Sequence, residues 1–167
     1  SYAALPWVLK EYALLPCGGA LGRGCGPLVL TAGGGEEHTE AITDPAQLSG
    51  RTVAVPSERS TAYLLFRLWA EANVPGGVGR IEVMPFQQIM PAVRDGRIDA
   101  GLVIHEARFT YQNYGLRMLV DLGEWWEQDT GLPIPLGAII ARRSLDTEAI
   151  RNWIRASLDY ARRHPQA

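Results

Sequence analysis

Short β-branched or apolar segments alternate with longer amphipathic segments along most of this chain, and this alternation constrains its fold. PLVLTA, RTVAVP, RIEVMPF and IDAGLVIHE each have the length and composition of a strand. SERSTAYLLFRLWAEANV lies between two of them and carries apolar residues at helical spacing, at Ala62, Leu65, Phe66 and Trp69. Strands that alternate with helices indicate an α/β fold with a largely parallel sheet.

Capping signals predict further helices. DPAQLSG predicts a short helix that is capped by Asp44 and stopped by Gly50. QQIMPAVRDGR predicts a helix with Pro91 in its first turns and Gly96 as its C-terminal cap. EYALLP and RMLVDL are predicted strands, and GEWWEQDTG is a predicted helix. PIPLGAIIARR predicts one long strand, and DTEAIRNWIRASLDYARRH predicts a final amphipathic helix.

The order of these elements predicts a two-lobed organisation. Residues 32–136 are expected to form one compact α/β lobe. PLVLTA and LGAIIARR, at its two ends, are interpreted as paired connecting strands, so that residues 1–31 and 137–167 supply connecting strands and a remnant of a first lobe. In such a plan a ligand lies between the lobes. GGGEEHTEA is interpreted as a loose polar turn with a surface position.

Composition excludes several classes of function. The net charge is −2 and no basic run is present, which argues against nucleic acid as a partner. No apolar segment reaches the roughly 18 residues that a membrane span requires, and the first residues lack the pattern of a signal peptide. Cys17 and Cys25 are too few and too oddly spaced for a zinc site, and they predict free thiols in a reduced compartment. We therefore expect a cytoplasmic protein with no membrane partner.

The glycine-rich stretch CGGALGRGCG is predicted to be a loop. A phosphate-binding loop is disfavoured, because such a loop lies between a strand and a helix, whereas here a strand follows. The glycines allow close approach of the backbone to a ligand, and Arg23 is a candidate anion contact. The pair Trp125–Trp126 is interpreted as packing rather than as a cofactor platform.

Two polar segments directly follow predicted strands. His105 ends the apolar run that begins at Gly101, and Ser60 and Thr61 begin a helix soon after RTVAVP. Because ligands meet the carboxyl ends of parallel strands in open α/β sheets, both segments are expected at one rim. A helix start with a hydroxyl can be an N-cap, and its N–H groups can also hold a carboxylate.

His105 has three interpretations: a core histidine, a metal ligand or a general base. An imidazole base suits chemistry near neutral pH. The metal interpretation is the weakest, because His38 and His164 lie in polar segments and no second ligand is evident. Glu106 is expected on the opposite face of the strand, which makes it a poor partner for the ring. The residues alone do not decide between a core histidine and a base.

Five separated segments resemble the 1,4-dihydroxy-6-naphthoate synthase family: SYAA, GGALGRGCGPLVL, VAVP followed by STAYLL, GLVIHEARFTYQNYGL, and DLGEWWEQDTGLPIPLGAI. The resemblance covers nearly the whole chain in the same order. It implies a type II periplasmic-binding-protein-like fold used for catalysis, here mostly one α/β lobe with connecting strands. The implied activity is that of a lyase of the futalosine route to menaquinone, which converts cyclic dehypoxanthinylfutalosine to 1,4-dihydroxy-6-naphthoate without a metal or organic cofactor.

The resemblance also implies roles for particular residues. The histidine of the VIHE segment, His105, would be the proton acceptor. Thr61, Ala62 and Ser1 would contact the carboxylate of a small-molecule substrate. Proton removal from the spiro-fused substrate would precede C–C cleavage, and aromatisation of the second ring would drive the reaction. Apolar walls that include Tyr111 or Tyr114 would exclude water.

The chain departs from this family in its extent. The family begins with a further strand–helix–strand segment that carries a Pro-Asn-Asp motif, and it continues past the last helix predicted here. We therefore expect residues 1–167 alone to bind weakly and to be poorly active. The alternatives are a chorismate dehydratase-like enzyme and a non-catalytic solute-binding module on the same fold, since a fold by itself does not separate catalyst from binder.

Overall fold

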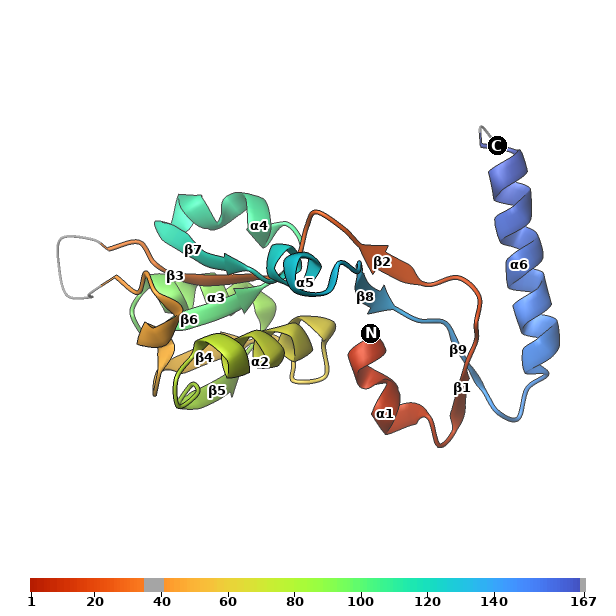
Figure 1. Ribbon diagram of the computed structural model, residues 1–167, viewed down its shortest axis with the longest axis horizontal. Helices are drawn as coiled ribbons and strands as arrows, with labels where there is room; N and C mark the ends of the chain where they lie inside the picture. The colour runs from red at the N-terminus through yellow and green to blue at the C-terminus, as the bar shows by residue number, and fades with distance from the viewer. Residues whose placement is uncertain (35–40, 166–167) are drawn as a thin grey trace. The chain divides into compact units, whose positions relative to one another are not determined.

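The computed structural model describes residues 1–34 and 41–165, which form two compact units (Figure 1). Unit 1 consists of Ser1–Leu21 and Pro135–Ala167, and unit 2 consists of Gly22–Ile134. Most of the predicted turn GGGEEHTEA lies outside the described residues.

Unit 2 is built on a five-stranded sheet with the strand order β5-β4-β6-β3-β7. Its strands are β3 (Leu28–Ala32), β4 (Thr52–Val55), β5 (Arg80–Val83), β6 (Ala100–Val103) and β7 (Leu116–Asp121). β4 pairs in parallel with both β5 and β6, whereas β3 is antiparallel to both β6 and β7. The predicted α/β fold is confirmed, but the sheet is mixed rather than largely parallel, because β3 is reversed and both of its pairings are antiparallel.

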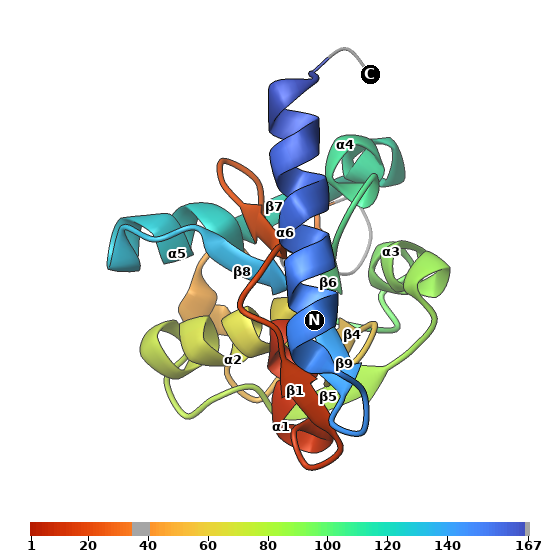
Figure 2. The same cartoon turned by 90° about the vertical axis from the view of Figure 1, so that its right-hand side faces the viewer.

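Helices cover both faces of this sheet. They are the 3₁₀ helix η2 (Pro45–Leu48), α2 (Thr61–Asn73), α3 (Phe86–Arg94), α4 (Ala107–Thr110), the 3₁₀ helix η3 (Tyr111–Tyr114) and α5 (Leu122–Thr130). Val29 packs in the same cluster as Phe66 of α2, whereas Leu28 and Leu30 pack with Ile89 of α3. Since successive side chains of a strand point to opposite faces, α2 and α3 lie on opposite faces of the sheet, as Figure 2 shows.

The predicted caps are largely confirmed. Asp44 caps η2 by accepting a hydrogen bond from Ala46 N at 2.8 Å, and Gln47 completes a capping box. Gly96 follows α3 with φ +69° and donates to Val93 O. Pro91 lies within the first two turns of α3, as predicted, and the helix begins at Phe86, one residue before the predicted segment.

The prediction that PLVLTA is a connecting strand is wrong. It forms β3, which lies between β6 and β7. Leu28, Val29 and Leu30 are all almost completely buried, because both faces of the strand are covered. The loop CGGALGRGCG contains a short strand, β2 (Ala20–Gly22), and PIPLGAIIARR is divided into β8 (Ile134–Gly137) and β9 (Ile140–Arg142). β2 pairs with β8.

Unit 1 has a small core. β1 (Tyr12–Leu14) is antiparallel to β9, and the helices are η1 (Tyr2–Ala4), α1 (Leu5–Val8) and α6 (Thr147–Arg163). α6 confirms the predicted final helix. Its residues Ile150 and Ile154 pack on Leu15, Cys17 and Ala141. Both cysteines are free, as predicted; Cys17 is buried and Cys25 is exposed.

Gly26 and Gly123 lie in close backbone contact, where the chain enters β3 and begins α5. A Cβ atom on Gly26 would overlap the backbone N and Cα of Gly123. We expect Gly26→Ala to lower the free energy of unfolding of unit 2 by about 1–3 kcal/mol, because backbone must move. Urea unfolding measures this loss. Gly137→Ala in unit 1 is the control for the glycine-to-alanine change itself, since its Cβ would make only an ordinary contact with Ala20 at 3.5 Å and unit 2 should keep its stability. Equal losses in the two variants would contradict the close approach.

Candidate functional site

Two polar segments meet at one edge of the sheet of unit 2. β4 and β6 are adjacent and parallel, with Val53 opposite Ala100 and Ala54 opposite Gly101. Their carboxyl ends therefore lie at the same edge. The chain leaves β4 toward the start of α2 and leaves β6 through His105 toward α4. The predicted convergence of these two segments at one rim is confirmed.

His105 has an unusual backbone conformation. Its φ is +56°, and among the described residues it is the single non-glycine residue with a positive φ. The left-handed conformation costs an L-residue other than glycine roughly 1–2 kcal/mol. Residues held in such conformations cluster at active sites and ligand clamps. The side chain is exposed, so the interpretation of His105 as a core histidine is wrong.

The residues on either side of His105 explain its exposure. Ile104 packs against the core that contains α2, and Ala107 is buried in the core on the side of α3. The chain passes from one face of the sheet to the other between these two anchors, and His105 and Glu106 are left exposed. Arg108 N donates to His105 O at 3.2 Å, so α4 begins directly after the turn.

The start of α2 has the predicted capping geometry. Ser60 is the N-cap, and its Oγ accepts a hydrogen bond from Tyr63 N at 3.1 Å and donates to Ser57 O at 3.0 Å. Thr61 and Ala62 are the first two residues of the helix, and both are buried. A helix start carries a partial positive charge, which favours a negatively charged group beside it. This end of α2 is therefore chemically suited to a carboxylate.

Removing the Ser60 cap tests this local geometry. We expect Ser60→Ala to lower the free energy of unfolding by about 1 kcal/mol, because Tyr63 N loses its acceptor. Urea unfolding, monitored by tryptophan fluorescence, measures the loss. Ser60→Thr keeps the hydroxyl group and serves as the control. If Ser60→Ala were as stable as Ser60→Thr, the hydroxyl would not be acting as a cap.

A buried ion pair lies close to His105, and the sequence analysis missed it. Arg108 Nη2 lies 2.6 Å from Asp121 Oδ2, and Arg108 Nη1 donates to Gly26 O at 3.0 Å. Asp121 is only 3% exposed. Its Oδ1 caps α5 by accepting from Gly123 N at 2.8 Å and from Glu124 N at 3.3 Å. The pattern Asp-Leu-Gly-Glu from Asp121 is typical of a helix start, so the sequence could have predicted Asp121 as a cap. It carries no signal for the ion pair with Arg108.

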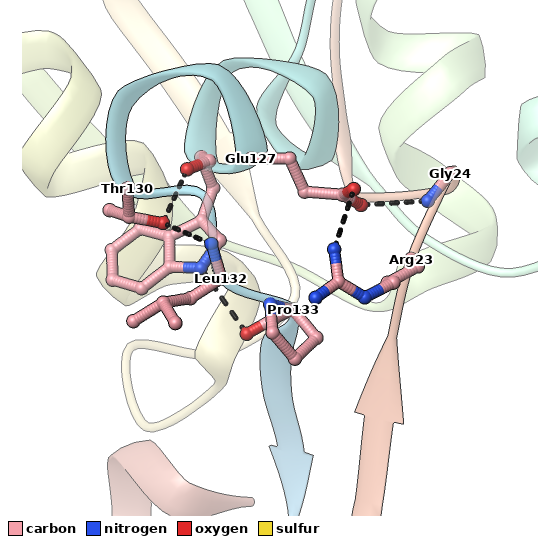
Figure 3. Close-up of polar contacts among 7 residues, drawn as sticks. Arg23, Gly24, Glu127, Thr130, Leu132 and Pro133 are labelled. Atoms are coloured by element: carbon pink, nitrogen blue, oxygen red, sulfur yellow. Dashed lines mark hydrogen bonds and ion pairs between the residues drawn. The ribbon is translucent and has the colours of Figure 1, made fainter.

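Arg23 lies beside a carboxylate of its own unit. Its guanidinium is 3.6 Å from Glu127 of α5, and Gly24 N donates to the same carboxylate at 2.7 Å (Figure 3). Contact of Arg23 with an anion stays a prediction. Trp125 and Trp126 pack against the core of unit 2, which confirms the packing interpretation.

The remaining candidates are divided between the units. Tyr111 and Tyr114 are partly buried and pack on the core beside α3. Ser1 is the N-cap of η1 in unit 1, and its contact with substrate stays a prediction. His164, also in unit 1, stacks on Tyr160 with ring centres 4.3 Å apart, whereas His38 lies outside the described residues.

Residues 1–34 and 41–165 hold no group of three or more His, Cys, Asp or Glu side chains that could bind a metal ion. Nor do they contain a helix with the length and apolar character needed to cross a membrane.

Sequence comparison links the chain to a biosynthetic family. The family model described as "Menaquinone biosynthesis" matches residues 1–167. A 1,4-dihydroxy-6-naphthoate synthase from Streptomyces coelicolor is 68% identical over 170 residues, which is 100% of this chain and 57% of that protein. A synthase of the same name from Thermus thermophilus is 48% identical over 170 residues, which is 99% of this chain and 56% of that protein. The chain thus spans somewhat more than half the length of these relatives.

Structural comparison identifies the fold. Protein AF1704 from Archaeoglobus fulgidus is 35% identical, with a TM-score of 0.70 over 98% of this chain and 57% of that chain. The periplasmic aliphatic sulphonate binding protein SsuA from Escherichia coli is 18% identical, with a TM-score of 0.62 over 95% of this chain and 50% of that chain. At that identity the likeness shows the fold alone. The expected periplasmic-binding-protein-like fold is confirmed.

Proposed function

Because the chain belongs to the menaquinone biosynthesis family, we propose that it forms the catalytic part of a 1,4-dihydroxy-6-naphthoate synthase. The reaction is a lyase step that converts cyclic dehypoxanthinylfutalosine to 1,4-dihydroxy-6-naphthoate. The names of the Streptomyces coelicolor and Thermus thermophilus relatives support this proposal. So does the order of the five segments that resemble that family.

The observation that carries the proposal is the geometry of His105. An exposed imidazole at the carboxyl end of β6 is held in a left-handed conformation that a bulky residue adopts only at a cost. A neutral imidazole there can accept a proton from a bound substrate. In the proposed reaction His105 takes a proton from the spiro-fused substrate. C–C cleavage then releases a three-carbon fragment, and the second ring becomes aromatic.

The start of α2 supplies the second half of the proposed site. Thr61 and Ala62 would contact the substrate carboxylate at the start of α2, where the helix dipole favours negative charge. They follow β4, the neighbour of the strand that carries His105. A carboxylate held there would fix the substrate relative to the base, and fixed orientation is a large part of enzymatic rate enhancement. Ser1 would provide a further contact to the carboxylate.

The surroundings of the proposed site suit a reaction that excludes water. Tyr111 and Tyr114 follow α4, and their rings lie partly against the core beside α3. They would contribute to the apolar wall around the bicyclic ring. We propose that the reaction runs in the cytoplasm without a metal or organic cofactor, and the free thiols of Cys17 and Cys25 suit a reducing compartment.

Two alternatives use the same fold. A non-catalytic solute-binding module is supported by the likeness to SsuA, a periplasmic binding protein. A chorismate dehydratase-like enzyme would use similar scaffolding for another substrate. Turnover separates an enzyme from a binder, because the fold and a strained residue occur in both.

A chimaera tests the proposal at full length. Residues 1–167 replace the matching stretch of the Streptomyces coelicolor relative, which is 68% identical, and the unmodified relative serves as the positive control. Each protein is incubated with cyclic dehypoxanthinylfutalosine and, separately, with chorismate. We expect the naphthoate product from the first substrate and none from the second. A folded chimaera that binds the first substrate in calorimetry without turnover would favour the binding module instead.

A further inference from the structure

The left-handed turn at His105 needs a structural cause. A residue other than glycine keeps a positive φ only when contacts on both sides of it hold the backbone in that conformation. Upstream, β6 fixes the chain by pairing with β4 and β3. Downstream, α4 is a single turn of helix, which is too short to be stable by itself. Something outside α4 must therefore hold it in place.

Arg108, in the first turn of α4, makes the contacts that do so. Its guanidinium reaches Asp121 Oδ2 at 2.6 Å with one nitrogen and Gly26 O at 3.0 Å with another. Gly26 precedes β3, and Asp121 ends β7 and caps α5. One side chain thus ties α4 to two other segments of unit 2. Arg108 N also donates to His105 O, so its own backbone is joined to the strained residue.

The burial of the Arg108–Asp121 ion pair restricts the motion of α4 relative to the rest of unit 2. The side chain of Asp121 is 1% exposed and that of Arg108 is 23% exposed. Asp121 Oδ1 accepts from the backbone at the start of α5, whereas Oδ2 has no hydrogen bond and its ion-pair partner is Arg108. The acceptor is therefore fixed in place by α5. Breaking such a pair from one side leaves a buried charge uncompensated, which is strongly unfavourable.

We infer that Arg108 is a positioning residue, which locks α4 against Asp121 and Gly26 and thereby holds His105 in the left-handed conformation that presents its imidazole. The planar fork of arginine places one nitrogen on Gly26 O and another beside Asp121 Oδ2, whereas the ammonium group of lysine is a point charge on a flexible stem. The effect on catalysis rests on the proposed function of His105, whereas the effect on its conformation does not.

The conformational part is tested by NMR on residues 1–167. The three-bond coupling between the amide proton and Hα, and the ¹³Cα and ¹³Cβ shifts, report whether His105 is left-handed. The variants are Arg108→Gln, Arg108→Lys and the control Arg97→Gln, which removes an exposed arginine 3.9 Å from Asp95. We expect the left-handed signature in the wild type and the control, its loss in Arg108→Gln and a weakened signature in Arg108→Lys. A folded Arg108→Gln that kept the signature would overturn the inference.

A double variant tests the same inference if Arg108→Gln alone does not fold. Arg108→Gln combined with Asp121→Asn removes the buried charge together with its partner, so the expected instability is smaller. Asn at position 121 still caps α5. The same NMR signature is then read from this variant. Loss of the left-handed signature supports positioning by Arg108, and its retention overturns it.

Turnover of the chimaera separates the two proposals. With Arg108→Gln we expect kcat to fall on the order of 100-fold while KM changes little, because a misplaced base affects the chemical step more than binding. Arg108→Lys should recover part of the loss, and Arg97→Gln should behave as wild type. If His105 lost its conformation and turnover stayed normal, positioning would stand and the catalytic function of His105 would fall. If kcat fell while His105 stayed left-handed, the positioning inference would be wrong.

Discussion

His105→Ala is expected to lower turnover of the chimaera by about 100- to 10,000-fold, the range that general acid–base catalysis contributes. His105 lies at the carboxyl end of β6, beside the strand that leads to the start of α2. Its side chain is exposed, so the substitution removes little packing. The loss should therefore appear in kcat rather than in the stability of unit 2. Initial rates of naphthoate formation, measured by chromatography, give the value.

Two further variants make this prediction specific. His105→Asn should lose as much activity while keeping the backbone conformation, because asparagine tolerates left-handed φ better than most residues. His164→Ala should keep wild-type turnover, since that ring stacks on Tyr160 in unit 1. Full turnover by His105→Ala would remove histidine from the mechanism, and an equal loss in His164→Ala would point to a non-specific effect.

Phe66→Ala is expected to have the largest effect on stability, a loss of about 3–5 kcal/mol in the free energy of unfolding of unit 2. Phe66 lies on α2, is 0% exposed and packs beside Trp69 with ring centres 6.0 Å apart. Truncation removes the buried ring and leaves a cavity between α2 and the sheet. Urea unfolding monitored by tryptophan fluorescence measures the loss.

Phe109→Ala is the matched control for this substitution. It makes the same chemical change in unit 2, at a side chain that is 81% exposed. Its effect on the free energy of unfolding should stay within about 0.5 kcal/mol, as is usual for surface positions. A loss in Phe66→Ala no larger than the loss in Phe109→Ala would mean that α2 is not packed as described.

Local patterns explain why so much of the fold was predictable. The segments that form β4, α2 and α6 carry their own signals: β-branched runs, an apolar stripe at helical spacing and capping side chains. Ser60 was a candidate cap from its place before that stripe, and the structure confirms it. Such signals depend on residues that are close in sequence, so a single sequence contains them.

The errors concern properties that depend on distant residues. The placement of β3 between β6 and β7 depends on strand pairing, which no residue of PLVLTA encodes by itself. β2 pairs with β8, far along the chain, and this partner makes a strand of a glycine-rich stretch. The ion pair of Arg108 with Asp121 likewise joins two elements that only the fold brings together.

In the candidate site, too, the features set by nearby residues were predictable and those set by distant residues were not. His105 and Thr61 were expected at one edge of the sheet because each follows a predicted strand. The parallel pairing of β4 with β6 confirms that edge. The positive φ of His105 was not predictable, because histidine is enriched among non-glycine residues with positive φ but still adopts it in a small minority of cases. We propose that α4 and its anchor set this conformation; the exposure of His105 already rules out a core histidine.

The most direct test of His105 as the proton acceptor is rescue of the His105→Ala variant of the chimaera by added imidazole. Removing this exposed side chain at the carboxyl end of β6 leaves a position where a free imidazole can act as the base. We expect the initial rate of naphthoate formation by the variant to rise with the imidazole concentration, while the rate of the unchanged chimaera stays constant. No rise in the variant, or the same rise in both proteins, would contradict the proposed function of His105.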